Sequence, residues 1–252
     1  MTTTSYSERF QSQEAVEFYD SKEYSSESYS TAIWNLERPV LEAIMNDLGR
    51  ERKQSLRLLD FACGTGRVLS SLEGLVGSAD GIDISESMVA AARAKCVKAR
   101  LRVGDILAEP ELCQGHYDAI SCFRFLLNAE PEMRDRILGR LRDALSTPDG
   151  RLLINVHGNS RSLRHPALAW RRWRARAGNS DEPLNEMSPA ETRELLRKNG
   201  FEVVRQFGFG AVPPTLYRSP LRSAAWAIDK SLAGDHWWND WSIEMLFLCR
   251  PC

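Results

Sequence analysis

The sequence has little cysteine, little histidine and no long hydrophobic run. Its six cysteines are scattered over 252 residues, which argues against a disulfide framework and favours reduced thiols. The CxxC formed by Cys249 and Cys252 has no further cysteine or histidine at ligand spacing, so we expect no metal site. No stretch approaches the roughly 18 apolar residues of a membrane span, and the opening residues, MTTTSYSERFQSQE, contain no apolar signal core. These absences predict a cytoplasmic protein without a transmembrane segment.

Excess charge is also missing. The formal net charge is -1, so no global field attracts nucleic acid or an anionic membrane, and we expect no nucleic-acid partner. Residues 161–176 are a local exception, because they combine six arginines with two tryptophans and contain no acid. This Arg/Trp segment is typical either of a solvated helix face or of a surface for an anionic acceptor or lipid headgroups, so peripheral membrane contact is one interpretation. We expect a monomer or a homodimer.

Strand-like and helix-like segments alternate along most of the chain. The apolar patterns predict strands at 56–63, 81–84, 99–106, 117–126, 151–158, 201–210 and 241–250. Helical spacing and capping residues predict helices at 67–76, 85–97, 131–145 and 188–201, and an amphipathic helix over Leu41, Ile44, Met45 and Leu48. Because parallel strands need helical crossovers, this alternation predicts an α/β fold with a doubly wound, mostly parallel seven-stranded sheet.

A glycine loop follows the first of these strands, in LLDFACGTGRVL (58–69). Small residues let the backbone turn sharply and approach a ligand at the start of the next helix. A dinucleotide fingerprint would place a third glycine where this chain has Leu69. Asp83 and Asp105 end the next two strands, and strand ends converge on one crevice at the carboxyl edge of such a sheet.

In their order and spacing, LLDFACGTGRVL, GIDISESMVAAAR, GDI and YDAISCFRFLLN resemble the motif series of class I S-adenosylmethionine-dependent methyltransferases. The resemblance implies S-adenosyl-L-methionine as the cofactor. It implies that the loop residues face the methionine part, that the acid after the second strand holds the ribose, and that the acid after the third strand meets the adenine. The implied cofactor-binding residues are Asp60, Ala62, Gly64, Gly66, Asp83, Ile84, Met88, Asp105, Ile106, Phe123 and, from the lid, Tyr24.

The same resemblance organises the chain. It implies a Rossmann-like methyltransferase fold with an N-terminal helical lid at 1–50, a cofactor-binding core at 51–157 and an inserted cap segment at 158–187. Residues 188–252 then complete the same α/β domain and include a substrate-lid segment near 213–240. Two other interpretations stay open from the sequence: an NAD(P)-dependent oxidoreductase on a similar sheet, and a cofactor-binding regulatory protein without catalysis.

The sequence identifies the residues that would bind the methyl acceptor less clearly than those that would bind the cofactor. His157 follows the fifth strand at the carboxyl edge, and we expect it to be the general base, although a loop-fixing histidine would look the same. Arg124 and Asn128 follow the fourth strand and are further catalytic candidates. Arg124 either clamps a carboxylate or pairs with Glu130 or Glu132. Aromatic residues in the extra segments predict a lidded pocket for a small organic acceptor, with oxygen marginally favoured as the methylated atom.

Overall fold

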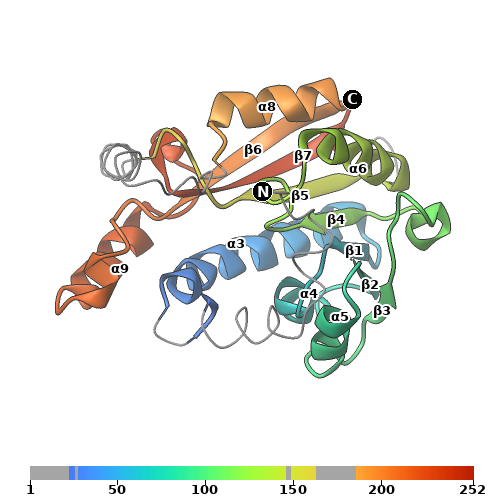
Figure 1. Cartoon of the computed structure of the whole chain (residues 1–252), viewed down its shortest axis with the longest axis horizontal. Coiled ribbons are helices and arrows are strands. Elements are labelled where there is room, and N and C mark those ends of the chain that lie inside the picture. Colours follow the sequence, from blue (N-terminus) through green and yellow to red (C-terminus); the bar gives the residue numbers. More distant parts are fainter. Residues whose placement is uncertain (1–22, 26–27, 146–148, 163–185) are drawn as a thin grey trace, which may run out of the picture.

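The computed structural model describes residues 23–25, 28–145, 149–162 and 186–252. Seven strands form one sheet in the order β3-β2-β1-β4-β5-β7-β6, with β7 antiparallel to both of its neighbours and the other strands parallel (Figure 1). The strands are β1 (Arg57–Phe61), β2 (Ser78–Asp83), β3 (Arg100–Val103), β4 (Ala119–Cys122), β5 (Arg151–Val156), β6 (Phe201–Phe209) and β7 (Glu244–Pro251). The predicted doubly wound, mostly parallel sheet is confirmed.

Helices cover both faces of this sheet (Figure 1). One layer holds α3 (Tyr29–Arg52), α4 (Arg67–Leu72) and α5 (Glu86–Arg93), and the other holds α6 (Pro131–Ala144) and α8 (Pro189–Lys198). Each layer buries its own apolar cluster against the strands, with Leu41 and Met45 of α3 in one and Leu138 of α6 in the other. The sheet is therefore buried on both faces, which is the usual condition of parallel strands.

Side-chain caps fix where several helices begin. The hydroxyl of Ser85 accepts from the backbone N–H of Met88 at 3.3 Å, and that of Ser28 accepts from Thr31 at 3.0 Å. Ser188 and Glu191 form the predicted capping box at the start of α8. Because each cap satisfies a backbone donor that the helix leaves unpaired, the sequence specifies these ends locally.

A buried carboxylate anchors α9 (Arg222–Leu232), which lies at one end of the molecule (Figure 1). Asp229 is fully buried, and its Oδ1 accepts from the backbone N–H groups of Ala211 and Val212 at 2.7 and 3.0 Å. Its Oδ2 accepts from the Tyr217 hydroxyl at 2.6 Å. The helix is thereby tied to the segment that follows β6.

Asp229→Ala should loosen this anchor, because three donors lose a buried acceptor. We expect the free energy of opening of α9, measured by amide hydrogen exchange, to fall by about 3 kcal/mol. Asp235→Ala is the matched control, since Asp235 forms an exposed ion pair with Arg205 and its loss should change stability by less than about 0.5 kcal/mol. Equal protection of α9 in the two variants would contradict the anchoring role.

Some predicted features fall outside the described residues. These are most of the Arg/Trp segment and most of the cap segment at 158–187. Of the predicted N-terminal lid, the structure describes residues 23–25 and α3. Within the described ranges, no helix has the length and apolar character that crossing a bilayer requires.

Candidate active site

The glycine loop makes a left-handed turn between β1 and α4. Ala62, Gly64 and Gly66 have φ values of 55°, 53° and 77°. Glycine adopts this region without cost, whereas Ala62 is held there by its surroundings. The turn is closed by the backbone N–H of Gly66, which donates to the carbonyl of Cys63 at 2.9 Å, and α4 starts at the next residue. The loop and the first turn of α4 therefore face the carboxyl edge of the sheet, as predicted.

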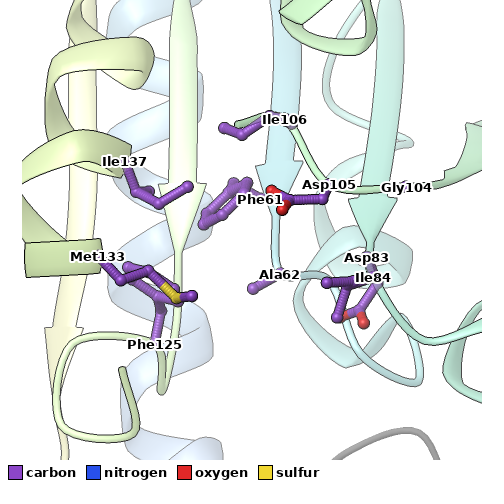
Figure 2. A pocket seen from close by; sticks show the side chains of 10 residues that line it. All are labelled: Phe61, Ala62, Asp83, Ile84, Gly104, Asp105, Ile106, Phe125, Met133 and Ile137. Carbon is purple, nitrogen blue, oxygen red and sulfur yellow. The ribbon is translucent and has the colours of Figure 1, made fainter. Parts of the chain in front are cut away.

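A pocket of about 500 Å³, including its open mouth, lies beside this loop. It is lined by Phe61, Ala62, Asp83, Ile84, Gly104, Asp105, Ile106, Phe125, Met133 and Ile137. Figure 2 shows Asp83 and Asp105 on one side of the pocket and Phe125, Met133 and Ile137 on the other, with Phe61 between them. None of the described residues that line it is basic, so the pocket suits a planar, hydroxylated group better than a phosphate.

Asp83 links the pocket to the glycine loop. Its Oδ2 accepts from the backbone N–H of Gly64 at 2.8 Å, and its Oδ1 accepts from that of Ser85 at 2.9 Å. Burial raises the pKa of Asp83, while these backbone donors oppose the shift. The carboxylate therefore fixes the loop and the start of α5 at the same time as it lines the pocket.

Asp60 lies under the loop in a different setting. It is buried in β1, and its Oδ1 accepts from the Ser121 hydroxyl at 2.6 Å. No group in the described part of the chain bonds its buried Oδ2. Burial raises the pKa of Asp60 to about 7. An unpartnered buried oxygen at this point is consistent with a ligand or water completing the loop.

The other predicted cofactor residues are divided between pocket and core. Ala62, Ile84, Asp105 and Ile106 line the pocket. Met88 and Phe123 are buried, and Phe123 packs in the apolar cluster between α3 and the sheet. Phe125, two residues after Phe123, lines the pocket. The predicted contact between Phe123 and the cofactor stays a prediction.

Arginine and aromatic side chains meet next to the loop. Arg67, the first residue of α4, has its guanidinium carbon 4.1 Å from the ring centre of Tyr24 and 4.3 Å from that of Trp34. Arg124 lies 5.2 Å from the Tyr24 ring and pairs with Glu23 at 2.7 Å. Glu23 and Tyr24, which belong to the predicted lid, are thus held beside the glycine loop by both arginines.

Arg124 has a left-handed backbone, with φ of 55°. The Asn128 side chain donates to the Arg124 carbonyl at 2.5 Å, which stabilises this turn. A second ion pair joins Arg124 to Glu244 of β7 at 3.6 Å. These contacts show Arg124 paired with Glu23 and Glu244, and they give Asn128 a local structural partner.

Buried polar side chains between α3 and the sheet extend the group of charged residues around Arg124. Asn155 donates through Nδ2 to Glu37 Oε1 at 2.7 Å and to Glu244 Oε2 at 3.5 Å. Burial and the charge of Glu244 raise the pKa of Glu37 to about 8. Burial also raises the pKa of Glu244, opposed by Arg124. The pair therefore carries less than two negative charges at neutral pH.

His157 lies one residue beyond β5, at the same edge. Burial and the positive charge of Arg124 lower the pKa of His157 to about 3. No partner for its Nδ1 exists among the described residues. The imidazole is therefore neutral near pH 7, which suits it to hydrogen bonding and makes it a weak proton acceptor.

The family model named Methyltransferase domain matches residues 34–206, well over half of the chain. The chain belongs to this family. It is an S-adenosylmethionine-dependent methyltransferase of class I, which decides against the oxidoreductase interpretation. A comparison with curated proteins finds no match.

Solved methyltransferase structures share the fold of this methyltransferase. Magnesium protoporphyrin IX methyltransferase from Synechocystis PCC 6803, with bound SAH, is similar with a TM-score of 0.57 and 17% identity, over 88% of this chain and 86% of that one. A possible histamine N-methyltransferase from Thermotoga maritima gives a TM-score of 0.54 and 15% identity, over 94% and 98%. Mitomycin 7-O-methyltransferase gives 0.59 and 14%, over 99% and 61%. At these identities the likeness shows the fold alone.

The residues at the sheet edge fit the cofactor of this family. The apolar walls of the pocket suit an adenine, and Asp83 and Asp105 present acceptors for hydroxyl and amino groups. When bound, the cofactor supplies an electrophilic methyl group on a sulfonium sulfur. The acids and the open backbone of the loop suit such a cation, which carries no phosphate.

Several polar residues of the site were missed from the sequence. Each of them looks like an ordinary member of its element: Glu37 in the buried stripe of α3, Arg67 at the start of α4 and Glu244 in β7. A signal existed for two of them. Glu37 occupies an inward position in the stripe of Ile33 and Leu41, and Glu244 occupies the position before the strand alternation of Leu246. A charged residue at an inward position requires a buried partner.

Proposed function

We propose that the methyltransferase acts on a small organic acceptor, with oxygen favoured over nitrogen or carbon as the methylated atom. The observation that carries this proposal is the buried polar cluster at the carboxyl edge, where Glu37, Asn155, His157 and Glu244 offer mostly acceptor atoms. Such a set favours a ligand that brings its own O–H or N–H donors. Tyr24 and the described lid lie against this edge, which favours a compact acceptor over a polymer.

Roles for the predicted residues follow from their positions. We propose that Asp60, Ala62, Gly64, Gly66, Asp83, Ile84, Met88, Asp105, Ile106, Phe123 and Tyr24 form or support the cofactor site. Arg124 positions the lid and Glu244, and Asn128 supports the turn that presents Arg124. His157 is proposed to contact the acceptor as a neutral imidazole, since its low pKa makes it a weak base.

Incubation with S-adenosylmethionine and a panel of phenols, alcohols, carboxylic acids and amines tests the proposal. Binding of SAH is measured by calorimetry, and methylated products are identified by mass spectrometry. We expect SAH binding and O-methylated products. Products methylated on nitrogen alone would contradict the preference for oxygen. Tight SAH binding without any methylated product would contradict the proposed acceptor class.

His157→Ala should separate acceptor contact from cofactor binding. We expect turnover to fall by about 10- to 100-fold. Loss of the hydrogen bond leaves a polar group of the acceptor buried without a partner, which costs about 1.4 to 2.7 kcal/mol. The dissociation constant of SAH should stay within about threefold. His116→Ala is the control, since His116 is exposed and precedes β4, at the end of that strand away from the carboxyl edge. Unchanged turnover in His157→Ala would remove His157 from the acceptor site.

A further inference from the structure

The inner face between α3 and the sheet changes from apolar to polar at the carboxyl edge. On β5, Leu153 packs in the apolar cluster and Asn155, two residues on, points to the same side. On β7, Leu246 packs in that cluster and Glu244 precedes it by two residues. On α3, Leu41 is apolar and Glu37 lies one turn before it. Three elements therefore place polar groups together where an apolar core would otherwise continue.

Burying these groups is unfavourable unless their hydrogen bonds are complete. The residue exposures of Glu37, Asn155 and Glu244 are 3%, 1% and 4%. Yet within the described residues Asn155 Oδ1 and His157 Nδ1 have no hydrogen-bond partner. A buried polar atom without a partner costs about 1 to 3 kcal/mol. Two such atoms beside a carboxylate pair point to a ligand that supplies hydrogen-bond donors.

The charges that face this point define its chemistry. Arg124 lies 3.6 Å from Glu244, and Arg67 of α4 and Glu23 of the lid also act electrostatically on Glu244. Glu37 is the second carboxyl, and the charge of Glu244 raises its pKa. The Arg124 guanidinium favours the charged form of Glu244 and opposes the rise in its pKa that burial causes. The low pKa of His157 keeps the imidazole neutral near pH 7. Of the two carboxyls, Glu244 is the one that pairs with an arginine and is thereby favoured as the anion.

We propose that the acceptor binds through a hydroxyl or amine group at Asn155 Oδ1, His157 Nδ1 and Glu244, and that Glu244 takes its proton during methyl transfer. The inference rests on the proposed function of methyl transfer to a small acceptor. The acceptor oxygen or nitrogen uses a lone pair to bond the methyl carbon, and the carbon–sulfur electron pair stays on sulfur. The acceptor proton moves to a carboxylate oxygen of Glu244. Glu37 is a positioning residue, which holds Asn155 at 2.7 Å.

Carboxamide variants test this assignment, because glutamine keeps the shape and removes the proton-accepting charge. With S-adenosylmethionine and a panel of phenols, catechols, primary amines and carboxylic acids, we expect Glu244→Gln to reduce kcat by about 100-fold or more. Glu37→Gln should lower kcat less than Glu244→Gln does, and it should flatten the alkaline side of the pH profile of kcat/KM, because it removes the buried carboxyl whose pKa is raised. Glu42→Gln is the control, since Glu42 lies on α3 in a partly exposed pair with Arg38. SAH affinity by calorimetry should be equal in all variants within about threefold.

Each outcome decides the assignment. Turnover of Glu244→Gln within about threefold of the wild-type value would overturn the role of Glu244. Methylation of carboxylic acids alone would overturn the acceptor class, because a carboxylate has no proton to give at neutral pH. The acceptor class would also be overturned if the wild-type protein bound SAH but methylated none of the phenols, catechols or amines. Failure of the wild-type protein to bind SAH would instead refute the methyltransferase site itself.

Discussion

Replacing Asp83 by alanine is expected to weaken SAH binding by about 100-fold or more, which corresponds to about 2.7 kcal/mol. Two effects add. The carboxylate lines the pocket, so its loss removes an acceptor for the ligand. It also holds the backbone N–H of Gly64 at 2.8 Å and that of Ser85 at 2.9 Å, so its loss releases the glycine loop and the start of α5. Binding and the shape of the site therefore depend on one side chain.

Calorimetric titration with SAH measures the effect. Glu86→Gln serves as the control, because Glu86 is an exposed carboxyl only three residues away, and its affinity should match the wild type. Since burial raises the pKa of Asp83, wild-type affinity should also fall on acidification, beginning at a higher pH than for an ordinary aspartate. That dependence should be absent in Asp83→Ala. Affinity of Asp83→Ala within about threefold of wild type would contradict the assignment.

Local sequence patterns predict most of the fold and the part of the site that lines the cofactor pocket. Apolar runs and glycine punctuation predict each strand within a few residues, because a buried parallel strand leaves a short continuous pattern. The ends of successive strands then meet at one edge by topology alone, which is why Asp83 and Asp105 come together in the pocket although they are 22 residues apart.

The residues proposed to bind the methyl acceptor are harder to predict from the sequence, because they come from elements that are distant along the chain. Glu37 and Asn155 are 118 residues apart and hydrogen-bonded. Asn155 and Glu244 are 89 residues apart. Neither contact has a local signature, since each residue only interrupts an apolar pattern. The environment that lowers the pKa of His157 is equally invisible in its neighbours INVHGN.

Leu69 explains how the loop differs from a dinucleotide site. It occupies the position of a third glycine and is fully buried. Its Cδ2 lies 2.6 Å from where a Cβ on Gly81 of β2 would be, so the absence of a side chain at Gly81 makes room for the leucine. The close packing of α4 on the sheet thus depends on a glycine in β2, at Gly81, instead of a glycine at position 69 of α4. The leucine was identified from the sequence, whereas its compensation at Gly81 required the sheet register.

Gly66→Ala is expected to lower the free energy of unfolding by about 3 kcal/mol, which combines left-handed strain with overpacking. A Cβ on Gly66, at φ of 77°, would lie 2.8 Å from Cys96 Sγ and 3.0 Å from Ala92 Cβ. Both atoms belong to the packed interface of α4 with α5 and the residues after it, and they have little space to move. Urea unfolding of the protein without cofactor measures the loss.

Gly64→Ala is the matched comparison, because the two glycines share the loop and the left-handed backbone. At Gly64, with φ of 53°, nothing lies within 4 Å of an added Cβ. Only the strain remains, so the unfolding free energy should fall by about 1 kcal/mol. The empty space at Gly64 faces the place where we propose that the cofactor meets backbone, so the same methyl group should weaken SAH binding by about 30-fold. One glycine would then be required for packing and the other for ligand approach. Equal losses of stability in both variants, or unchanged SAH affinity in Gly64→Ala, would show that the loop does not divide its functions in this way.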